Sequence, residues 1–598
     1  MNYSVIASLF YIIALTAVVS GFYFYKKSDL ALHAGTWVPL TFMALMGYQT
    51  LVAGILSLIK IKVNIITIGL FDLAAAIALW IFIFKMKKLQ KYKYELADFA
   101  AWFFILTAVL VFLKPRYGFK LIPTYNSVDA AVHFSSARAI VNNQSVWGMY
   151  YSAFHNGLLI ETLGPFVKAA YIYKIYVSGD IMHLILAGAM FWGVIRRYAN
   201  STLLKVIGIV ATIMYLMGYP LNSTIFGFAY LGMGITVIAF IIASADIYLN
   251  DEISKKWSIM LLCFGCYGVF QSYVLFMPVV FFALLAFVLV QQAVNKKLFS
   301  LQTILTGLGI FLPATLLGLW YTYGGIFGSS GGDGGGSGTT VASAINIEGG
   351  IYTDLFSNFI FLTPIALFGL FGIFKEKKKN YMLFLVPVDI LFVLALLYKA
   401  LKHQVSAYYY YKNYYMLWLL AWILFFMGIY YLEKNARLIA CFTIAIWLMM
   451  FGMNYKGIEG RISEKNPNLC PQYNTYNLSH IYSFNRTFIA ITHYSQEKID
   501  LYTYVINNIL NDENGYVPLA GGVEDYFWMQ AITDTSCQDF QYWNRGQDAY
   551  FSSLINDNIH YIMVFKDNDF YTANAGYFES LEKIYENNTG FIGIVKQQ

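Results

Sequence analysis

Long apolar runs, separated by short polar stretches, extend over most of the chain. Most of them hold about 20 residues, the length that an α-helix needs to cross the hydrocarbon core of a bilayer. The pattern predicts an all-α polytopic membrane domain over residues 1–453 with about fourteen transmembrane helices, the stretch 258–293 being divided near Gln271-Ser272. The expected ranges are 4–25, 37–59, 63–84, 97–113, 176–195, 202–219, 228–249, 258–272, 274–293, 301–322, 356–374, 381–399, 416–432 and 438–453.

Basic residues gather in every second loop between these runs. Because loops rich in lysine and arginine remain in the cytoplasm, this alternation predicts the topology. It places the N-terminus and the segments 114–175, 323–355, 400–415 and 454–598 outside the cytoplasm. The first run has no basic residues before it, so we expect it to stay as the first helix and not to be a cleaved signal. The basic clusters are Lys26-Lys27, Lys85 to Lys93, Arg196-Arg197, Lys255-Lys256, Lys296-Lys297, Lys375 to Lys379, and Lys434 with Arg437.

The composition indicates that lipid is the main solvent of the chain. Of 598 residues, 59% are hydrophobic and 12% are charged, and the mean hydropathy of +0.56 excludes an ordinary soluble protein. The net charge of +7 implies no nucleic-acid partner, because the basic excess sits in the short loops. Abundant Asn, Lys, Tyr and Ile suggest an AT-rich genome, and we expect the plasma membrane of a bacterium.

Residues 454–598 differ from the preceding part in being polar and acidic, with 9 basic and 17 acidic side chains. The runs Tyr561–Phe565 and Phe591–Val595 have the pattern of strands, and 497–510 has that of a helix. We therefore expect a small α/β domain outside the cytoplasm.

The cysteines divide between this domain and the apolar runs. Cys470 and Cys537 would form a disulfide in an oxidising outer compartment, and two free thiols are the alternative. Cys263, Cys266 and Cys441 fall in predicted membrane helices, where they serve as small apolar residues.

Residues 324–350 are rich in glycine, and their composition favours a flexible loop. They contain no GxxxxGK[ST] motif, which argues against a phosphate-binding loop. In a second interpretation the segment is a mobile lid over an active site, bringing Asp333 or Glu348 with it.

The outer segment 126–140 holds the first candidates for chemistry. Its alanine spacing predicts a helix on which Asp129 and His133 lie one turn apart on the same face. There the carboxylate could orient the imidazole, or both could meet one substrate. In the alternative, Asn126 or Ser127 caps this helix and Asp129 only complements its dipole.

Further polar groups approach the same membrane face around the start of the fifth predicted span. They are His155 and Glu161 before the span, and Asp180 and His183 near its outer end. Ionisable groups inside a span are costly and are usually functional or paired.

The order of these residues resembles the first outer loop of the GT-C superfamily of polytopic membrane glycosyltransferases. Asp129-x-x-x-His133 is followed by Tyr-Tyr-Ser-Ala-Phe-His155 and then by a membrane helix. Members often have an Asp in this loop, and many related proteins continue with a pattern like Tyr-Pro-x-x-Phe-His, in which Ser152-Ala153 here replaces the proline. Many spans and a polar C-terminal outer domain extend the resemblance to the architecture.

The resemblance implies a sugar donor carried on polyprenyl phosphate or pyrophosphate. Such carriers present sugars outside, whereas nucleotide sugars stay inside. By residue carry-over, Asp129 is the acid/base that deprotonates or positions an acceptor hydroxyl as it attacks the anomeric carbon. The further catalytic candidates are His133, His155 and Glu161.

A leaving lipid phosphate would need a cationic partner near the membrane. Tyrosines flank Lys412 on both sides, which fits such a partner but fits equally an aromatic belt with a snorkelling lysine. The candidate cations are Lys412, His403, Lys402, Arg138 and Arg116.

A divalent cation, Mg²⁺ or Mn²⁺, could bind between Asp129 and either Asp180 or Glu161, because some members of the superfamily use one; otherwise no cofactor is required. The sequence contains no HExxH, paired CxxC or EF-hand motif, so no dedicated zinc or calcium site is predicted.

We therefore predict a glycosyltransferase that moves a sugar from a polyprenyl-phosphate-linked donor to an acceptor outside the cytoplasm, which would be a cell-envelope glycan, a lipid or a protein. A transporter or flippase of lipid-linked glycans is the main alternative, and it would need ionisable groups along a path across the membrane. A polysaccharide polymerase or ligase is close in chemistry, and a receptor role ranks last. For two further acids inside spans, Asp72 and Asp389, we expect a role in packing.

Overall fold

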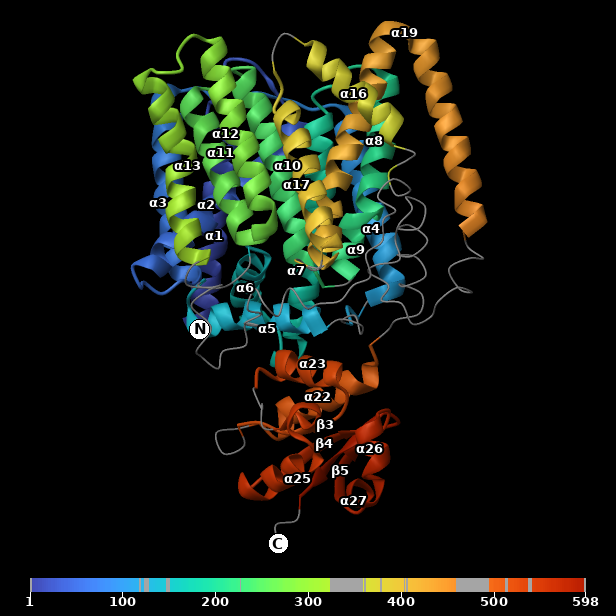
Figure 1. Ribbon diagram of the computed structural model, residues 1–598. Coiled ribbons are helices and arrows are strands. Elements are labelled where there is room, and N and C mark those ends of the chain that lie inside the picture. Colours follow the sequence, from blue (N-terminus) through green and yellow to red (C-terminus); the bar gives the residue numbers. More distant parts are fainter. Residues whose placement is uncertain are drawn as a thin grey trace.

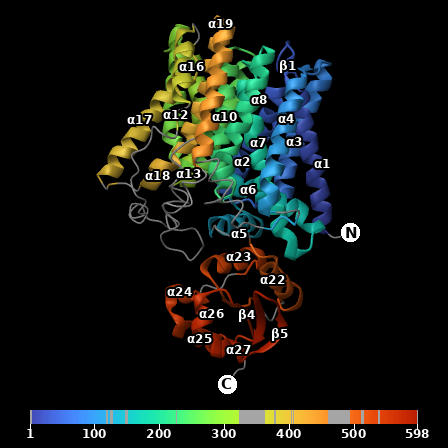
Figure 2. The same ribbon diagram turned by 90° about the vertical axis from the view of Figure 1, so that its right-hand side faces the viewer.

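A tall helical bundle with a small separate domain at one end makes up the structure (Figure 1). The helix α5 (Val128–Asn143) lies between the bundle and that domain in both views (Figures 1 and 2), and α1 begins at the same end. The computed structural model describes residues 3–117, 120–122, 128–146, 151–225, 227–322, 359, 362–376, 379–402, 404, 407–458, 494–510, 515–535 and 540–595.

Eleven helices in these ranges are long and apolar enough to cross a membrane. Helix α10 is buried over almost its whole surface and forms the centre of the bundle, whereas α3 and α4 expose large apolar side chains. Apolar residues on the outside are expected where the surrounding solvent is lipid. The eleven are α1 (Tyr3–Phe24), α2 (Ala34–Leu58), α3 (Ile65–Met86), α4 (Leu96–Tyr117), α7 (Ile172–Ile195), α8 (Thr202–Met217) taken together with the short α9 (Tyr219–Ile225), α10 (Ala229–Leu249), α12 (Met277–Val294), α13 (Leu301–Thr322), α17 (Met382–Leu401) and α19 (Tyr414–Ile458).

The predicted polytopic helical fold is confirmed, and three features account for the difference between eleven and fourteen. Helix α11 (Lys255–Ser272) begins with two lysines, and α16 (Thr363–Lys375) is shorter than a span. Helix α19 bends at Ala436, whose φ of −160° and ψ of 85° are not helical, so the two predicted runs lie on either side of the bend. Figure 1 shows the two parts of α19 as adjacent helical segments joined at the bend.

The predicted division of the stretch 258–293 is also confirmed. Helix α11 ends at Ser272, and the short helix η3 (Val274–Phe276) separates it from α12. Cys263 and Cys266 are buried in α11, and Cys441 is exposed in α19, so all three lie in apolar helices as predicted.

The basic loops lie at the end of the bundle opposite to α5. There the strands β1 (Leu32–His33) and β2 (Tyr92–Lys93) pair in parallel. The buried guanidinium of Arg196 binds Glu95 at 2.9 Å and Asp98 at 2.8 Å, which joins the ends of α4 and α7. The predicted inner loops therefore lie together at one end of the bundle, while the side of the membrane that each end faces stays a prediction.

The C-terminal part contains the predicted small sheet with helices around it. Its strands have the order β3-β4-β6-β5, with β3 parallel to β4 and the other pairs antiparallel. Both predicted strands and the predicted helix are present, within two residues of their expected ends. The elements are α22 (Gln496–Asn508), β3 (Leu519–Ala520), α23 (Val523–Thr533), α24 (Tyr542–Arg545), α25 (Gln547–Asn556), β4 (Tyr561–Phe565), α26 (Asp569–Ala573), α27 (Ala575–Glu579), β5 (Glu582–Glu586) and β6 (Gly590–Ile594).

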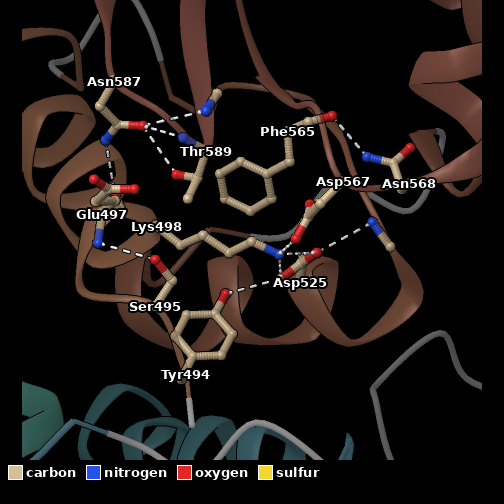
Figure 3. A network of polar contacts seen from close by, with 12 residues as sticks. Tyr494, Ser495, Glu497, Lys498, Asp525, Phe565, Asp567, Asn568, Asn587 and Thr589 are labelled. Atoms are coloured by element: carbon tan, nitrogen blue, oxygen red, sulfur yellow. Dashed lines mark hydrogen bonds and ion pairs between the residues drawn. The ribbon is translucent and has the colours of Figure 1, made fainter.

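A buried lysine ties the elements of this domain together (Figure 3). The Nζ atom of Lys498, on α22, lies 2.9 Å from a carboxylate oxygen of Asp525 in the first turn of α23 and 2.8 Å from one of Asp567 after β4. Burial opposes the charge of this lysine, but the two carboxylates hold its pKa above the ordinary value. Tyr494 donates to Asp525 as well, at 3.1 Å. The N-terminal end of α23 is thereby fixed to the domain.

Several predicted features lie outside the described residues. They are the Cys470–Cys537 pair, the glycine-rich segment 324–350 with Asp333 and Glu348, the alternative helix caps Asn126 and Ser127, and His403.

Candidate functional site

Helix α5 presents an apolar stripe to the bundle and its polar side chains along the other faces. The buried positions are Ala130, Ala131, Phe134, Ala137 and Ile140, which repeat at the three-to-four-residue spacing of one helix face. Phe134 stacks against the ring of Tyr176 on α7, with 4.9 Å between the ring centroids. This packing fixes the rotation of α5 and with it the direction of Asp129 and His133.

Gly227 allows the segment before α10 to touch the first turn of α5. A Cβ atom on Gly227 would lie 2.5 Å from the Cβ of Ala130 and 2.6 Å from its backbone, and the φ of +77° also favours glycine. The two residues that follow, Phe228 and Ala229, lead directly to Tyr230. The ring centroid of Tyr230 lies 4.7 Å from that of His133.

Lys412, from a later part of the chain, lies beside Phe228 in the segment before α10. It ends the short helix α18 (Ala407–Lys412), is only 5% exposed, and holds its Nζ atom 3.1 Å from the centre of the Phe228 ring. The next residue, Asn413, donates a hydrogen bond of 2.8 Å to Asp389 on α17. Asp389 thus helps to position the segment that carries Lys412, which agrees with the packing role expected for it.

The charge of Lys412 acts on both catalytic candidates of α5, Asp129 and His133. Burial, and then Lys412, lower the pKa of His133 to about 3, so this imidazole is neutral at physiological pH. The side chain of Asp129 is the exposed member of the group, yet the loss of water around it raises the pKa of its carboxyl, and Lys412 opposes that rise. We call these three residues, with Phe228 and Tyr230, the Asp129 cluster.

The other catalytic candidates make contacts inside the bundle. His155, on α6 (Tyr151–Leu163), hydrogen-bonds through Nε2 with the hydroxyl of Thr50 on α2 at 3.0 Å. Glu161 accepts a hydrogen bond of 3.0 Å from the backbone N–H of Ile65, the first residue of α3. Both bonds attach α6 to its neighbours, and a catalytic role for either residue stays a prediction.

Asp180 is engaged with α6 as well. It accepts a hydrogen bond of 2.9 Å from the amide of Asn156, and its carboxylate lies 4.0 Å from Nδ1 of His183. Among the described residues, no group of three His, Cys, Asp or Glu side chains is placed to hold a metal ion. A Mg²⁺ or Mn²⁺ site on Asp129 and Asp180 therefore stays a prediction.

Of the candidate phosphate-binding cations, Arg138 faces the C-terminal domain. Its guanidinium donates to the carbonyl oxygens of Ala531 at 3.0 Å and Ile532 at 2.8 Å, at the C-terminal end of α23. It also lies 3.2 Å from the carboxylate of Asp534, which accepts two further bonds from the amide of Asn142. Lys402 is exposed at the end of α17, and Arg116 belongs to the last turn of α4.

A recurring contact inside the bundle joins one buried acid to one carboxamide on another element. Asp72 accepts from Gln49 at 2.8 Å, Asp180 from Asn156 at 2.9 Å and Asp389 from Asn413 at 2.8 Å. We call these the carboxyl–carboxamide pairs. Each one cross-links two segments, as expected for polar groups that stabilise packing in a membrane.

Known proteins match the structure of this chain but not its sequence. No family model and no curated protein matches the sequence. The structure is similar to two crystal structures of ArnT from Cupriavidus metallidurans, one in the apo state and one bound to undecaprenyl phosphate. The TM-scores are 0.45 and 0.46, the sequence identity is 10% in both cases, and the similarity covers 82% of this chain and 96% of each ArnT chain.

Sequence reasoning missed the aromatic side of the Asp129 cluster. Residues 219–230 carry no charge and fall between two apolar runs, so nothing marked them as part of a site. The available signal is Gly227-Phe228, a glycine beside an aromatic residue at the end of a predicted span. Such a glycine often marks a close approach of two backbones.

Proposed function

We propose that this protein is a membrane glycosyltransferase that moves a sugar from a polyprenyl-phosphate-linked donor to a hydroxyl of an acceptor outside the cytoplasm. The observation that carries the proposal is that an exposed carboxyl, Asp129, lies within electrostatic reach of a buried lysine, Lys412, at the end of the bundle. This arrangement supplies a base for an acceptor and a fixed positive charge for a phosphate.

In the proposed step Asp129 is the base. The acceptor hydroxyl gives its proton to the Asp129 carboxylate while its oxygen forms a bond to the anomeric carbon. The bond between that carbon and the phosphate oxygen breaks, and its electron pair leaves with the polyprenyl phosphate. Asp129 then releases the proton to water. Its raised pKa supports this role, because a carboxylate with a higher pKa is a stronger base.

Lys412 is proposed to offset the charge that develops on the leaving phosphate. Its ammonium lies against the face of Phe228 and is buried, so it is poorly screened by water. His133, which is neutral, would donate or accept a hydrogen bond to substrate and would add no charge. The exposed apolar outside of the bundle supports access of a polyprenyl chain from the bilayer.

Transport is less well supported by the same contacts. A path for a charged substrate needs ionisable groups that face a cavity across the membrane. The acids Asp72, Asp180 and Asp389 are instead each bonded to a carboxamide of a neighbouring segment.

Transfer of labelled sugar from polyprenyl-phosphate donors, by the purified protein in lipid, tests the proposal. Wild type should turn over, and Asp129→Asn should lose turnover while it still binds donor, because the amide has nearly the shape of the carboxyl but cannot take a proton. Asp548→Asn, on an exposed position of the C-terminal domain, is the matched control. Movement of lipid-linked glycan between leaflets, without transfer by any form, would support the transporter instead.

A further inference from the structure

A cavity lies at the end of the bundle that carries the basic loops, far from the Asp129 cluster. Its volume is about 570 Å³, and it is formed where α10 and α12 end and where α11 and α13 begin. The residues that line it are Tyr248, Lys255, Lys256, Ile259, Gln292, Asn295, Lys297, Leu301, Gln302, Leu305 and Thr306.

The polar side of this cavity is cationic. Three of its lining residues are lysines, and within the described part of the chain no acidic residue lines it. Lys255 is held in place by the carbonyl oxygen of Tyr248 at 2.8 Å and by Asp251 at 2.6 Å. Lys297 donates to the neutral amide oxygen of Gln302 at 3.2 Å. Two lysines, Lys256 and Lys297, therefore keep a positive charge that no described carboxylate offsets.

The opposite side of the cavity is apolar and continues down the outside of α13. Leu301 and Leu305 line the cavity and are 71% and 58% exposed. Further exposed leucines continue the same stripe at steps of three and four residues along the helix, at Leu308, Leu312, Leu316 and Leu319. A helix face of this kind is in contact with lipid tails.

We propose that this cavity binds the headgroup of an anionic phospholipid, whose acyl chain lies along the leucine stripe of α13. The lysines match a phosphodiester, and Asn295 and Gln302 add neutral groups that can bond to its oxygens or to glycerol hydroxyls. A free phosphate would fit the lysines but would face the apolar wall. The basic loops predict that this end of the bundle faces the cytoplasm, where the membrane surface is negative.

Selection among lipids must come from the headgroup. Lipid tails are as apolar as leucine, so the stripe contributes little preference for one lipid over another. Each lysine near a membrane surface favours an anionic lipid by about fivefold, so loss of both Lys256 and Lys297 should lower the preference about thirtyfold. The proposal does not depend on the glycosyltransferase proposal, because the two sites lie at opposite ends of the bundle.

The test compares lipid retention by the purified full-length protein. The protein is released from nanodiscs that hold equal amounts of phosphatidylglycerol and phosphatidylcholine, and native mass spectrometry counts the lipids that stay bound. Wild type should retain phosphatidylglycerol preferentially, and Lys256→Gln with Lys297→Gln should lose that preference. The matched control is Lys88→Gln with Lys434→Gln, which removes two exposed lysines from the same end but outside the cavity.

The outcomes distinguish a lipid site from general attraction of anionic lipid by lysines and from a site for a free anion. Equal loss in the control pair would overturn the proposal, because it would mean that any lysine at this end attracts anionic lipid. Displacement of the retained lipid by millimolar inorganic phosphate or glycerol 3-phosphate would also overturn it, since a free anion would then suffice. Lys256→Gln alone is a second variant, and its side chain forms no hydrogen bond or ion pair with a described residue, so its fold should not change. It should show an intermediate loss.

Discussion

Arg138 and Asp534 form an ion pair with 3.2 Å between guanidinium nitrogen and carboxylate oxygen, and this pair joins the helix of Asp129 to the C-terminal domain. The same guanidinium binds two carbonyl oxygens at the end of α23, where the helix dipole favours a cation. The other end of α23 is fixed by Asp525 to Lys498. Helix α23 therefore connects the interior of the C-terminal domain to α5 (Figure 2).

We expect the Arg138–Asp534 pair to position Asp129. Arg138→Glu should lower kcat for sugar transfer by about tenfold to a hundredfold with a smaller change in KM, because displacement of a catalytic group by about 1 Å costs a factor of this size. Adding Asp534→Arg should restore part of the activity by reversing the pair. Steady-state kinetics of the single and double variants measures this.

The exposed pair Lys566–Glu586, at 2.7 Å in the same domain, supplies the matched control. Reversing it with Lys566→Glu and Glu586→Lys should leave kcat unchanged. If Arg138→Glu had full activity, the C-terminal domain would have no part in positioning α5.

The dependence of activity on pH should report the electrostatic effect of Lys412 on Asp129. Asp129 must be ionised to accept a proton, so activity falls as pH drops through its pKa, which lies above the ordinary value of 3.8. Lys412 lowers that pKa, so Lys412→Met should raise it further and shift the acidic limb of kcat/KM to higher pH. Loss of the cation should also lower the rate about a hundredfold.

Profiles of kcat/KM against pH for wild type, Lys412→Met and Lys399→Gln measure this shift. Lys399 is exposed at the same end of the bundle as Lys412, and among the described residues its side chain bonds to Gln404 alone, at 2.8 Å. Its variant should keep the wild-type profile. An acidic limb that does not move in Lys412→Met would mean that another group limits the rate.

Removing Lys498 should destabilise the C-terminal domain. In Lys498→Met the carboxylate of Asp525, which is 2% exposed, remains buried without its cation, and breaking such a pair costs about 3 to 5 kcal/mol. The double variant Lys498→Met with Asp525→Leu should recover part of this loss, since no uncompensated charge stays buried. Pulse proteolysis of the full-length protein in urea, followed by mass spectrometry of the fragments, compares the three forms.

The predicted topology can be checked with single cysteines. Cysteines introduced at Ser127, before α5, and at Ser254, before α11, should react with an impermeant maleimide from opposite sides of intact cells. Because the basic loops predict that the end opposite to α5 faces the cytoplasm, we expect Ser127→Cys to react from outside. Reaction of both from the same side would contradict the topology.

Most of the fold could be predicted from the sequence, because lipid requires long apolar runs and the runs reveal the helices. Even the separation of α11 from α12 and the strands β4 and β6 follow from local pattern. The bend at Ala436 and the length of α16 could not be predicted from the sequence, because packing against neighbours decides how far a helix extends. Orientation relative to the membrane was inferred from charge alone.

The candidate site could be predicted only in its local part. Asp129 and His133 share one helix turn, so their spacing predicts that they lie together. Lys412 was one cation among several, and only the folded chain brings it beside Phe228 and within electrostatic reach of α5. From the sequence, Arg138 was an equally good candidate to bind a phosphate. In the structure it binds the C-terminal domain instead, and its partner Ala531 lies 393 residues further along the chain.

The carboxyl–carboxamide pairs bear on how this bundle is assembled. Asp72 is fully buried in α3, and the amide of Gln49 donates a hydrogen bond to its carboxyl, so α3 can carry an acid without exposing it to lipid. Gln49, Asn156 and Asn413 each fix one pair of neighbouring segments, so the three pairs together restrict which segments can be neighbours in the assembled bundle.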